Sequence, residues 1–478
     1  MSSRHLDRPT LSRRSLIKGL GAGALLAGTG YGAAHADTEV GACDAIVIGA
    51  GFAGVTAARD LRAKGLRPLI LEARNRVGGR TWTDDFAGIT VEMGGEAVDE
   101  KQPNVWREVQ RYGIPLGTTL PAQRMYMPSE FGVYNALSPA EVGPRMAQLF
   151  TPFFDGSREM FPRPYEPLYR SDLVLPADSR SFKARLDQMG LSTQDRLWVS
   201  GSLSGLAGGN SDHGAYTMLM QSWALSGHTF QGYLSVNTYH PEAGTRALLN
   251  AMLADARADV RLNSPVVSVE HTGSRVKVTT KGGQVFTAPV AVIAVPVNVW
   301  RNISFSPALP AAYPQISTQG IGAPNVQKLW LLVDEADGQF STQPPEGTVL
   351  GAVRPHTRTP EGVVMFGFGY DPNVNFNDRA TVESHLRRVV PDVRVKAVKA
   401  HNWARDPYAL GGWSVRRPGQ LASGAFTTVQ QPRGRLAFAG SDLANGWSGY
   451  IDGAIESGAA AAAYAASVAR PAAAAFAH

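Results

Sequence analysis

Short, uninterrupted runs of apolar residues recur along the chain, and each predicts a buried β-strand. They occupy Ala45–Ile48, Pro68–Leu71, 289–296 and 436–442, the last of which ends at an acid. Runs without polar alternation are typical of strands in a parallel sheet that is covered on both faces. An Ala-rich segment starting near Phe52 separates the first two runs and predicts a helix. This strand–helix–strand order favours an α/β fold of the Rossmann type.

The pattern changes further along the chain. Residues 98–230 have helical periodicity broken by proline-rich loops, and the apolar, aromatic helix predicted at 216–225 fits either a pocket wall or an ordinary core. Strand-like runs return from Gly232 onward. The predicted strands are 259–262, 265–269, 275–280, 327–333 and 362–368, and the predicted helices are 247–256, 380–390 and a last one that runs through Ser457. The Ala-rich tail after about residue 459 carries little pattern.

The first predicted strand leads directly into a glycine-rich turn. Gly49, Gly51 and Gly54 form G-x-G-x-x-G, which allows a tight turn, close approach to a pyrophosphate and packing of the helix on the strand. The helix N-terminus adds N–H groups and partial positive charge that favour phosphates. The second strand ends at Glu72, at the spacing of an acid that binds a ribose hydroxyl. The unit indicates a dinucleotide site, and the alternative is a turn that binds nothing.

Two further glycine pairs follow this unit. Gly78 and Gly79 lie in a loop flanked by Arg76 and Arg80, which suits phosphate binding through backbone N–H and guanidinium groups. The second pair, residues 94–95, provides another point where the backbone can approach a flat ligand closely.

Length and composition narrow the class of protein. At 478 residues the chain is long enough for two or more domains, and 44% hydrophobic residues is typical of a globular protein. The net charge is +6, but the first 36 residues hold five Lys/Arg and one Asp and so contribute +4, which leaves +2 for the rest. Without a basic stripe interleaved with aromatics, nucleic-acid binding is not expected. The single cysteine, Cys43, excludes an intrachain disulfide, and we expect it to pack.

The first 36 residues resemble a twin-arginine export signal. Arg13 and Arg14 precede a short, mildly apolar segment at 19–34, and Ala34-His35-Ala36 fits a small-x-small cleavage site. The apolar segment is too short and Gly-rich for a membrane span. We therefore expect a periplasmic or secreted protein, and the alternative is a disordered basic N-terminus.

The separated motifs together resemble the flavin-containing amine oxidases, the monoamine oxidase-like group. Five blocks match in order, between about 41 and 465: the glycine turn with Glu72, the loop 76–80, residues 292–310, Lys328 at the start of a strand, and 438–458. A looser likeness to the bacterial nicotine and pseudooxynicotine amine oxidases rests on the leader, 161–167, 223–226 and Gly244 with its helix.

The resemblance implies an α/β two-domain fold: a Rossmann-like FAD-binding domain of the glutathione-reductase/amine-oxidase type with an inserted substrate-binding domain. The expected divisions are a signal peptide at 1–36, a discontinuous FAD-binding domain at 37–97, 232–300 and 405–465, a substrate-binding domain at 98–231 and 301–404, and an Ala-rich tail at 466–478.

The resemblance also implies FAD rather than NAD. Glu72 would hold the adenosine ribose, Arg74 and Arg80 would lie along the pyrophosphate, and Val266 would meet the adenine. Asp442 would approach the flavin, and the helix opening near Ile451 would direct its N-terminus at the flavin or pyrophosphate. The full expected FAD site is Gly49, Gly51, Ala53, Gly54, Glu72, Ala73, Arg74, Gly79, Arg80, Met93, Gly94, Gly95, Val266, Trp403, Gly440, Ser441, Asp442, Tyr450 and Ile451.

Three residues are the expected catalytic set. Lys328 matches a family lysine that holds a water against flavin N5, although a strand-end lysine can also reach solvent. Trp413 and Tyr450 match the two aromatic residues that flank the substrate amine, although two aromatics after glycine-rich turns are often core residues. No metal ligands are expected.

The chain departs from the family pattern at two positions. Some relatives have a cysteine linked covalently to the flavin, whereas this chain has Gly412, so we expect non-covalent FAD. Relatives usually have an aromatic residue two positions after Gly95, whereas this chain has Glu96-Ala97-Val98-Asp99. The loss of the aromatic opens space, and Glu96 or Asp99 either places an acid near a polar or dicationic amine or faces solvent.

The resemblance therefore implies oxidation of an amine to an imine, which hydrolyses to an aldehyde or ketone and an amine or ammonia. Electrons pass to O2 or a redox protein, and a homodimer is left open. The enzyme alternatives are an L-amino-acid oxidase, a polyamine or putrescine oxidase, a flavin desaturase and an NAD-dependent dehydrogenase; the non-enzyme alternative is a dinucleotide-binding protein without turnover. An amino-acid oxidase needs an arginine for the substrate carboxylate, and the sequence pattern places none.

Overall fold

The computed structural model describes residues 43–469. The expected signal peptide and the end of the Ala-rich tail lie outside these residues. The described residues belong to one unit.

A five-stranded parallel sheet forms the centre of the nucleotide-binding half, in the order β20-β13-β1-β2-β9. Its strands come from segments far apart in sequence, and they pair in register so that Ile46 lies between Ala291 and Leu69. The strands are β1 (Ala45–Ile48), β2 (Pro68–Leu71), β9 (Asp259–Arg261), β13 (Ala291–Ile293) and β20 (Leu436–Phe438).

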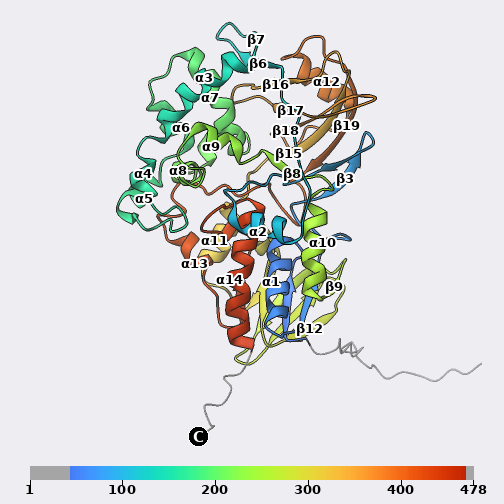
Figure 1. Cartoon of the computed structure of the whole chain (residues 1–478). Helices are drawn as coiled ribbons and strands as arrows, with labels where there is room; N and C mark the ends of the chain where they lie inside the picture. The colour runs from blue at the N-terminus through green and yellow to red at the C-terminus, as the bar shows by residue number, and fades with distance from the viewer. Residues whose placement is uncertain (1–42, 470–478) are drawn as a thin grey trace, which may run out of the picture. The chain divides into compact units, whose positions relative to one another are not determined.

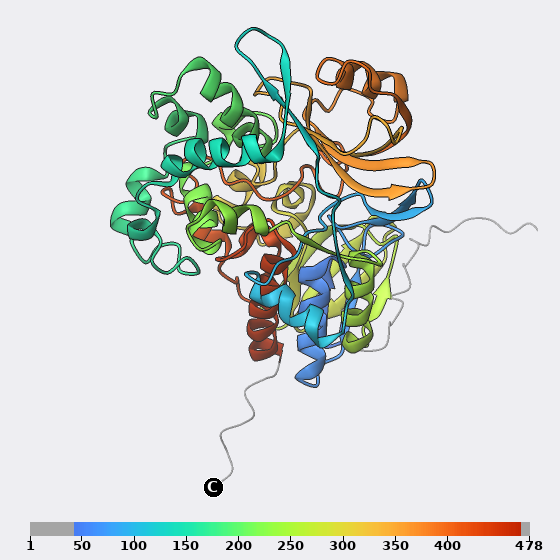
Figure 2. The same ribbon diagram turned by 45° about the horizontal axis from the view of Figure 1, so that its top comes forward.

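Helices and a second sheet cover the two faces of this parallel sheet. Ala45 and Val47 pack with the helices α1 (Phe52–Ala63), α10 (Thr245–Ala256) and α14 (Ile451–Ala469), which stand side by side in Figures 1 and 2. Ile46 and Ile48 share the opposite core with a four-stranded sheet in the order β12-β11-β10-β14. Its strands are β10 (Val266–His271), β11 (Val276–Thr280), β12 (Val285–Ala288) and β14 (Ser304–Ser306).

An antiparallel sheet in the order β17-β18-β15-β19 forms the centre of the other half. One face, which includes Leu329 and Val353, packs with α12 (Arg379–Arg387), and the other carries Trp330 and Phe366. Its strands are β15 (Gln327–Val333), β17 (Leu350–Thr359), β18 (Gly362–Gly369) and β19 (Val395–Asn402). Smaller sheets contain β3 (Thr83–Phe86), β4 (Ile89–Glu92), β5 (Leu116–Thr118), β6 (Arg124–Pro128), β7 (Tyr134–Leu137), β8 (Tyr239–Pro241) and β16 (Phe340–Thr342).

Short helices between residues 139 and 235 lie beside the antiparallel sheet, in the green part of Figure 1. Their core is aromatic, and Phe154 stacks on Trp223 with ring centroids 4.1 Å apart. These helices are α3 (Pro139–Phe150), α4 (Ser157–Met160), α5 (Ser171–Ala177), α6 (Phe182–Asp187), α7 (Thr193–Leu206), α8 (Tyr216–Leu225) and α9 (Phe230–Ser235). The remaining helices are α2 (Pro103–Arg111), α11 (Ala312–Gln319), α13 (Ala425–Val429) and the 3-10 turns η1 (Thr151–Phe154), η2 (Ser211–His213), η3 (Val297–Asn302) and η4 (Ser441–Leu443).

The structure differs from the sequence predictions in four elements. The strand predicted at 436–442 is confined to β20, and the chain turns into η4 at Ser441, so Asp442 lies in that turn and not at a strand end. The strand predicted at 289–296 is confined to β13, because the chain turns into η3 at Val297. Residues 116–137, predicted as part of a helical region, contain β5, β6 and β7. The last helix continues twelve residues past Ser457 to Ala469, because alanine favours helix and Ala461, Ala462 and Ala465 are buried.

The predicted domain division remains a prediction. The segments 37–97, 232–300 and 405–465 contribute all strands of the parallel sheet, and 301–404 contributes all strands of the antiparallel sheet β17-β18-β15-β19.

Candidate active site

The glycine turn has the geometry that its sequence predicts. Gly49 has φ +107°, and its N–H donates to Leu71 O at 2.8 Å. A Cβ on Gly54 would overlap the Gly49 carbonyl oxygen, so this glycine lets α1 pack on the strand. A Cβ on Gly51 would have no neighbour closer than 3.7 Å among the described residues. Protein packing therefore does not require Gly51, and the open space beside it fits the backbone approach of a ligand phosphate.

Glu72 lies at the end of β2 and faces this turn. Its carboxylate is 3% exposed and accepts from Ala50 N and Arg74 N, both at 2.8 Å. Each carboxylate oxygen keeps a second lone pair, so Glu72 retains acceptor capacity for ribose hydroxyls. Ser264 N donates to Glu72 O, which brings Val266 at the start of β10 to the same end of the sheet. Ala53 is buried in the first turn of α1, and Ala73 follows Glu72 directly.

The two arginines predicted along the pyrophosphate form ion pairs within the protein. Arg74 pairs with Asp406 at 2.5 Å and lies over the Tyr408 ring. Burial raises the pKa of Asp406, but hydrogen bonds from His401 and Arg74 outweigh it and hold that pKa well below its usual range.

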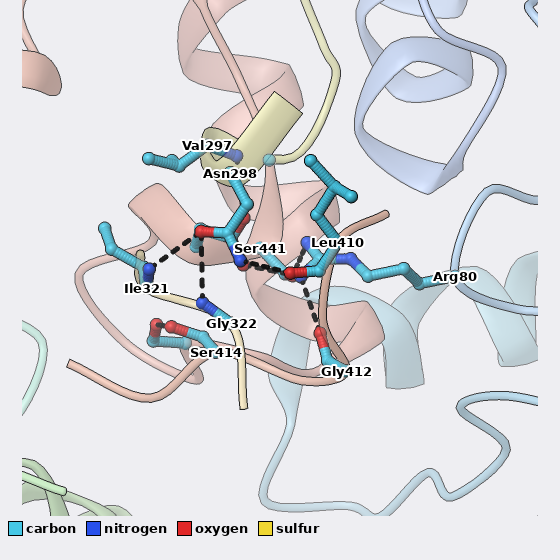
Figure 3. Close-up of polar contacts among 12 residues, drawn as sticks. Arg80, Val297, Asn298, Ile321, Gly322, Leu410, Gly412, Ser414 and Ser441 are labelled. Carbon is cyan, nitrogen blue, oxygen red and sulfur yellow. Dashed lines mark hydrogen bonds and ion pairs between the residues drawn. The ribbon is translucent and has the colours of Figure 1, made fainter. Parts of the chain in front are cut away.

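Arg80 connects three segments (Figure 3). Its guanidinium donates to Asp442 Oδ1 at 2.7 Å, Ser441 Oγ at 2.9 Å and Gly412 O at 3.0 Å. The buried Asp442 also accepts from Val297 N at 3.2 Å. The loop 76–80 is thereby fixed to the end of β20 and to the segment that precedes Trp413.

Asn298 links the loops on the other side of this network. Its side chain accepts from Ile321 N at 2.9 Å and donates to Leu410 O at 2.8 Å (Figure 3). Gly322 lies so close that a Cβ there would meet Asn298 Nδ2 at 2.7 Å. These bonds hold the segment around Gly412 against the segment that leads into β15.

Gly440 and Ile451 stand where the last strand meets the last helix. Gly440 N donates to Ser457 Oγ at 3.0 Å, which packs the end of β20 against α14. Ile451 is the first residue of α14 and is 7% exposed. The helix therefore begins next to the predicted cofactor segment.

The glycine pair at 94–95 lies beside Trp403 and the backbone of Arg80. A Cβ on Gly94 would overlap Arg80 O and approach Trp403 to 3.0 Å, whereas a Cβ on Gly95 would meet nothing closer than Thr81 Cγ2 at 3.7 Å among the described residues. Trp403 is 3% exposed, and its indole N–H donates to Met93 O at 2.8 Å. Trp403 and this glycine pair therefore meet in the structure, as the FAD prediction requires.

Lys328 is buried next to the same glycine pair. It is 2% exposed, and its Nζ donates to Gly94 O at 3.0 Å and forms an ion pair with Glu96 Oε1 at 3.1 Å. Trp330 and Phe366 place their ring faces 5.2 and 5.5 Å from this Nζ. The strand-end alternative, in which the lysine reaches solvent, is thus excluded. Glu96, which directly follows the glycine pair, is the counter-ion of Lys328.

Asp99 has a different position and role. It is 3% exposed, its Oδ1 accepts from Lys101 N at 3.0 Å, and its carbonyl accepts from Gln102 N. Asp99 therefore stabilises the turn that leads into α2, whereas Glu96 is the acid at Lys328.

Trp413 and Tyr450 lie on two segments that touch. Ser448 Oγ donates to Ser414 Oγ at 2.9 Å, and a Cβ on Gly449 would meet Ser414 N at 2.8 Å. The Trp413 indole N–H donates to Leu206 O at 2.8 Å, and its ring meets Phe368 edge-on. Burial raises the pKa of Tyr450 to about 12, so its hydroxyl stays neutral. The backbone therefore brings both predicted flanking aromatics to one place.

These contacts are those expected of a flavin amine oxidase, and the comparison with known proteins decides the family. Residues 52–466 match the family model of the flavin containing amine oxidoreductases. This chain belongs to that family.

Relatives and solved structures agree with this assignment. This flavin amine oxidoreductase is 34% identical to a nicotine dehydrogenase of Pseudomonas putida, over 87% of this chain and 86% of the relative. It is 35% identical to a pseudooxynicotine dehydrogenase of a Pseudomonas species, over 87% and 84%. A putrescine oxidase structure solved with putrescine has the same fold, with TM-score 0.75 at 22% identity over 88% of this chain and 98% of that one.

Membership of the family makes FAD the cofactor, and the residues present fit it. This fold class binds dinucleotides at the carboxyl end of the parallel sheet. Along that end lie the open backbone at Gly51 and Gly95, the acceptor Glu72 and the start of α14. Among residues 43–469 of this flavin amine oxidoreductase, no helix has the length and apolar character needed to cross a bilayer.

Several residues next to this site were not predicted from the sequence. Arg354 and His356 lie on β17, and Tyr233 lies on α9. Burial lowers the pKa of His356 to about 4, and its ring packs against Trp330 at 4.9 Å. No local sequence signal marks these residues, because their position depends on which face of the antiparallel sheet they occupy.

Proposed function

We propose that this flavin amine oxidoreductase oxidises a neutral amine held between Trp413 and Tyr450 to an imine, which hydrolyses to a carbonyl compound and an amine or ammonia. FAD, when bound, accepts the hydride equivalents from the carbon next to the amine nitrogen. The observation that carries the proposal is the buried Lys328–Glu96 pair beside Gly94, next to the touching segments of Trp413 and Tyr450.

The protein side chains select the reactive form of the amine. An amine that enters a site walled by Trp413, Tyr450 and Phe368 loses water, and desolvation favours its neutral form. The two rings restrict its orientation, which lowers the entropic part of the barrier. A ring face also attracts a cation, but only the neutral amine has the nitrogen lone pair that oxidation requires.

Lys328 and Glu96 have a positioning role in this proposal. The lysine has three donors, of which one reaches Gly94 O and another Glu96. The third is available to hold a water at the reacting carbon, where imine hydrolysis needs one.

Three finer parts of the proposal concern binding, electron transfer and location. We propose that FAD is held non-covalently, because Gly412 stands where some relatives have a flavin-linked cysteine. Electrons leave to O2 or to a redox protein. Export by the twin-arginine route is supported by Arg13 and Arg14 in the leader, and replacing both by lysine should retain the protein in the cytoplasm of the producing bacterium.

An anaerobic flavin-reduction screen tests the function. The holoenzyme is mixed without oxygen with monoamines, diamines, cyclic amines and amino acids, and the oxidised-flavin absorbance is followed. We expect at least one amine to bleach the flavin, with a carbonyl product. A yellow protein that no amine bleaches would contradict amine oxidation.

A lysine variant tests the site itself. Lys328→Met should slow anaerobic flavin reduction by about tenfold to a hundredfold, equivalent to about 1.4–2.7 kcal/mol of barrier. The matched control is Lys399→Met on the neighbouring strand β19, where a part-exposed lysine pairs with Asp84 at 2.7 Å. Reduction by Lys328→Met at the wild-type rate would remove this lysine from the mechanism.

A further inference from the structure

Arg354 is a cation without a counter-ion beside the expected substrate position. It lies in the middle of β17, and its guanidinium forms no hydrogen bond or ion pair with any of the residues that the structure describes. The groups that act electrostatically on it are the hydroxyls of Tyr370 and Tyr233, neither of which is an acid at neutral pH. A desolvated arginine normally lies against a carboxylate. Among the described residues, no carboxylate pairs with Arg354.

The register of the antiparallel sheet places Arg354 on the same face as Lys328. Arg354 pairs with Phe366 on β18, and Phe366 pairs with Trp330 on β15. Phe366 and Trp330 both have their rings against Lys328 Nζ. Val353, the preceding residue, belongs to the core on the opposite face with α12. Side chains alternate along a strand, so Arg354 projects toward the site and away from that core.

Protein packs around Arg354, although its side chain keeps solvent-accessible area. Burial is the largest cause that lowers the pKa of its guanidinium. Tyr233, Tyr370 and Tyr450 are each partly exposed, and burial raises the pKa of each.

Tyr233 lies between Arg354 and the predicted amine position. The hydroxyl of Tyr233 acts electrostatically on Arg354, and the hydroxyl of Tyr450 acts on Tyr233. The Tyr233 ring also packs against Trp223 at 5.8 Å, in the aromatic core of the helical region. Arg354 is therefore near Tyr233, and Tyr233 is near Tyr450, one of the two predicted flanking aromatics.

We propose that Arg354 binds the anionic end of the substrate, and that the substrate is an amine whose far end carries a carboxylate. This inference rests on the proposed amine oxidation and names its substrate class. A guanidinium offers paired donors that match a carboxylate, and the bond is strong where water is excluded.

The sheet geometry indicates that the carboxylate lies away from the reacting amine. Arg354 and Lys328 are two strands apart and about two residues apart along the strand direction. Two strand spacings correspond to about 10 Å between the backbones, so the two side chains reach different parts of one small molecule. An ω-amino acid, with its amine at one end and its carboxylate at the other, fits this separation better than an α-amino acid.

Arg354 also excludes a different substrate class. A diamine would place its second ammonium against an unpaired guanidinium, and like charges repel strongly in a desolvated site. Glu96 does not offset this repulsion, because it is already paired with Lys328 at 3.1 Å. The acid that the sequence suggested for a dicationic amine is therefore engaged elsewhere.

Matched substrates and variants test the inference. The holoenzyme is mixed anaerobically with hexylamine, 6-aminohexanoate and 1,6-diaminohexane, and with shorter and longer members of each series. We expect ω-amino acids to reduce the flavin with at least about tenfold higher kred/Kd than the neutral amine of equal length, and diamines to be poorest. This preference should disappear in Arg354→Met, persist in part in Arg354→Lys and shift toward diamines in Arg354→Glu.

Arg358→Met on the same strand is the control. Arg358 is exposed and pairs with Glu335 at 2.5 Å, so its loss should leave the preference unchanged. Arg354 has no ion-pair partner to lose, so Arg354→Met should fold and melt at the wild-type temperature or higher. A wild-type enzyme that prefers hexylamine to every ω-amino acid, or an Arg354→Met variant that keeps the anionic preference, would overturn the inference.

A binding titration separates this inference from the proposed function. Hexanoate has the carboxylate but no amine, so its binding is measured by the change in the flavin spectrum and does not depend on turnover. We expect hexanoate to bind wild type and to lose at least about tenfold in affinity in Arg354→Met, with Arg358→Met unchanged. Equal hexanoate affinity in wild type and Arg354→Met would overturn the anion site. A flavin that no amine reduces would instead overturn amine oxidation.

Discussion

Lys328 and Glu96 form a largely buried ion pair. Their side chains are 3% and 14% exposed, and the lysine also contacts two aromatic rings and the Gly94 carbonyl. Removing two charges from water is costly, and their attraction repays this cost only while both partners are present. The pair therefore makes the position of Lys328 dependent on Glu96.

Glu96→Gln tests this dependence. It removes the negative charge but keeps the size of the side chain, so we expect a loss of about 3 kcal/mol in the free energy of unfolding of the FAD-loaded protein. We also expect slower anaerobic flavin reduction, because Lys328 loses one of the two groups that fix it. Urea unfolding and stopped-flow reduction measure the two effects. Glu100→Gln, at an exposed position nearby, should change neither.

His356 gives a second prediction at the residue scale. Burial lowers its pKa from 6.5 to about 4, so the unfolded chain binds a proton between these values while the folded chain does not. Stability is therefore present above pH 6.5 and is lost as the pH falls toward 4, by up to about 3 kcal/mol from this group. His356→Phe, which suits the neighbouring Trp330 and Phe366 rings, should remove this part of the loss.

The measurement is the difference in unfolding free energy between pH 7 and pH 5. In wild type it contains the His356 contribution together with those of all other titrating groups, whereas in His356→Phe only the others remain. A variant with the same pH dependence as wild type would show that His356 does not control acid stability.

At the scale of elements, two glycines of the turn before α1 have different purposes: Gly54 serves folding, and Gly51 serves FAD binding. A Cβ on Gly54 would overlap the Gly49 carbonyl, whereas a Cβ on Gly51 has 3.7 Å to its nearest described neighbour. Gly54→Ala should therefore lose about 1–3 kcal/mol of stability with or without FAD. Gly51→Ala should keep the stability of the FAD-free protein within about 1 kcal/mol but bind FAD more weakly.

Chemical unfolding of the FAD-free variants and fluorescence titration with FAD measure the two quantities. If Gly51→Ala binds FAD as tightly as wild type, the phosphate does not approach the backbone at this residue. If Gly54→Ala is as stable as wild type, α1 does not pack on β1 as closely as the structure shows.

The sequence predicted those elements whose burial is uniform along the strand or helix. β1, β2, β15 and α8 agree with their predicted bounds, because each is an apolar run with one clear environment. β17 has no such run. It contains Pro355 and two irregularities in its pairing with β18, and its residues vary between buried, partly buried and exposed positions. A single-sequence pattern does not identify a strand of this kind.

The same limit applies to the site. The phosphate-binding turn is local in sequence, so its three glycines and Glu72 indicate a dinucleotide without further help. Lys328, Trp413 and Tyr450 depend on pairings across the chain and came only from resemblance to a family. The sequence pattern leaves Glu96 open between pocket and solvent. It does not identify Arg354, because the face that Arg354 occupies is decided by the register of β17 with β18.

At the scale of the whole molecule, the cofactor site is assembled from distant segments. The hydrogen bonds from Arg80 to the Gly412 carbonyl and to Asp442 join residues that are 332 and 362 positions apart in sequence. None of these contacts can form in the unfolded chain, so FAD binds the folded state and should stabilise it by an amount that grows with the logarithm of the FAD concentration. At a free FAD concentration of a hundred times Kd, the expected gain is about 2.7 kcal/mol.

Acid precipitation of the purified holoenzyme tests whether FAD is bound only by reversible, non-covalent contacts. Gly412 carries no thiol, and the single cysteine of the chain, Cys43, precedes β1 and contacts Thr287 O at the opposite end of the parallel sheet. Denaturation should therefore release all the flavin into the supernatant, and added FAD should raise the melting temperature of FAD-depleted protein progressively. Yellow colour that remains with the precipitate after washing would demonstrate a covalent bond through another residue.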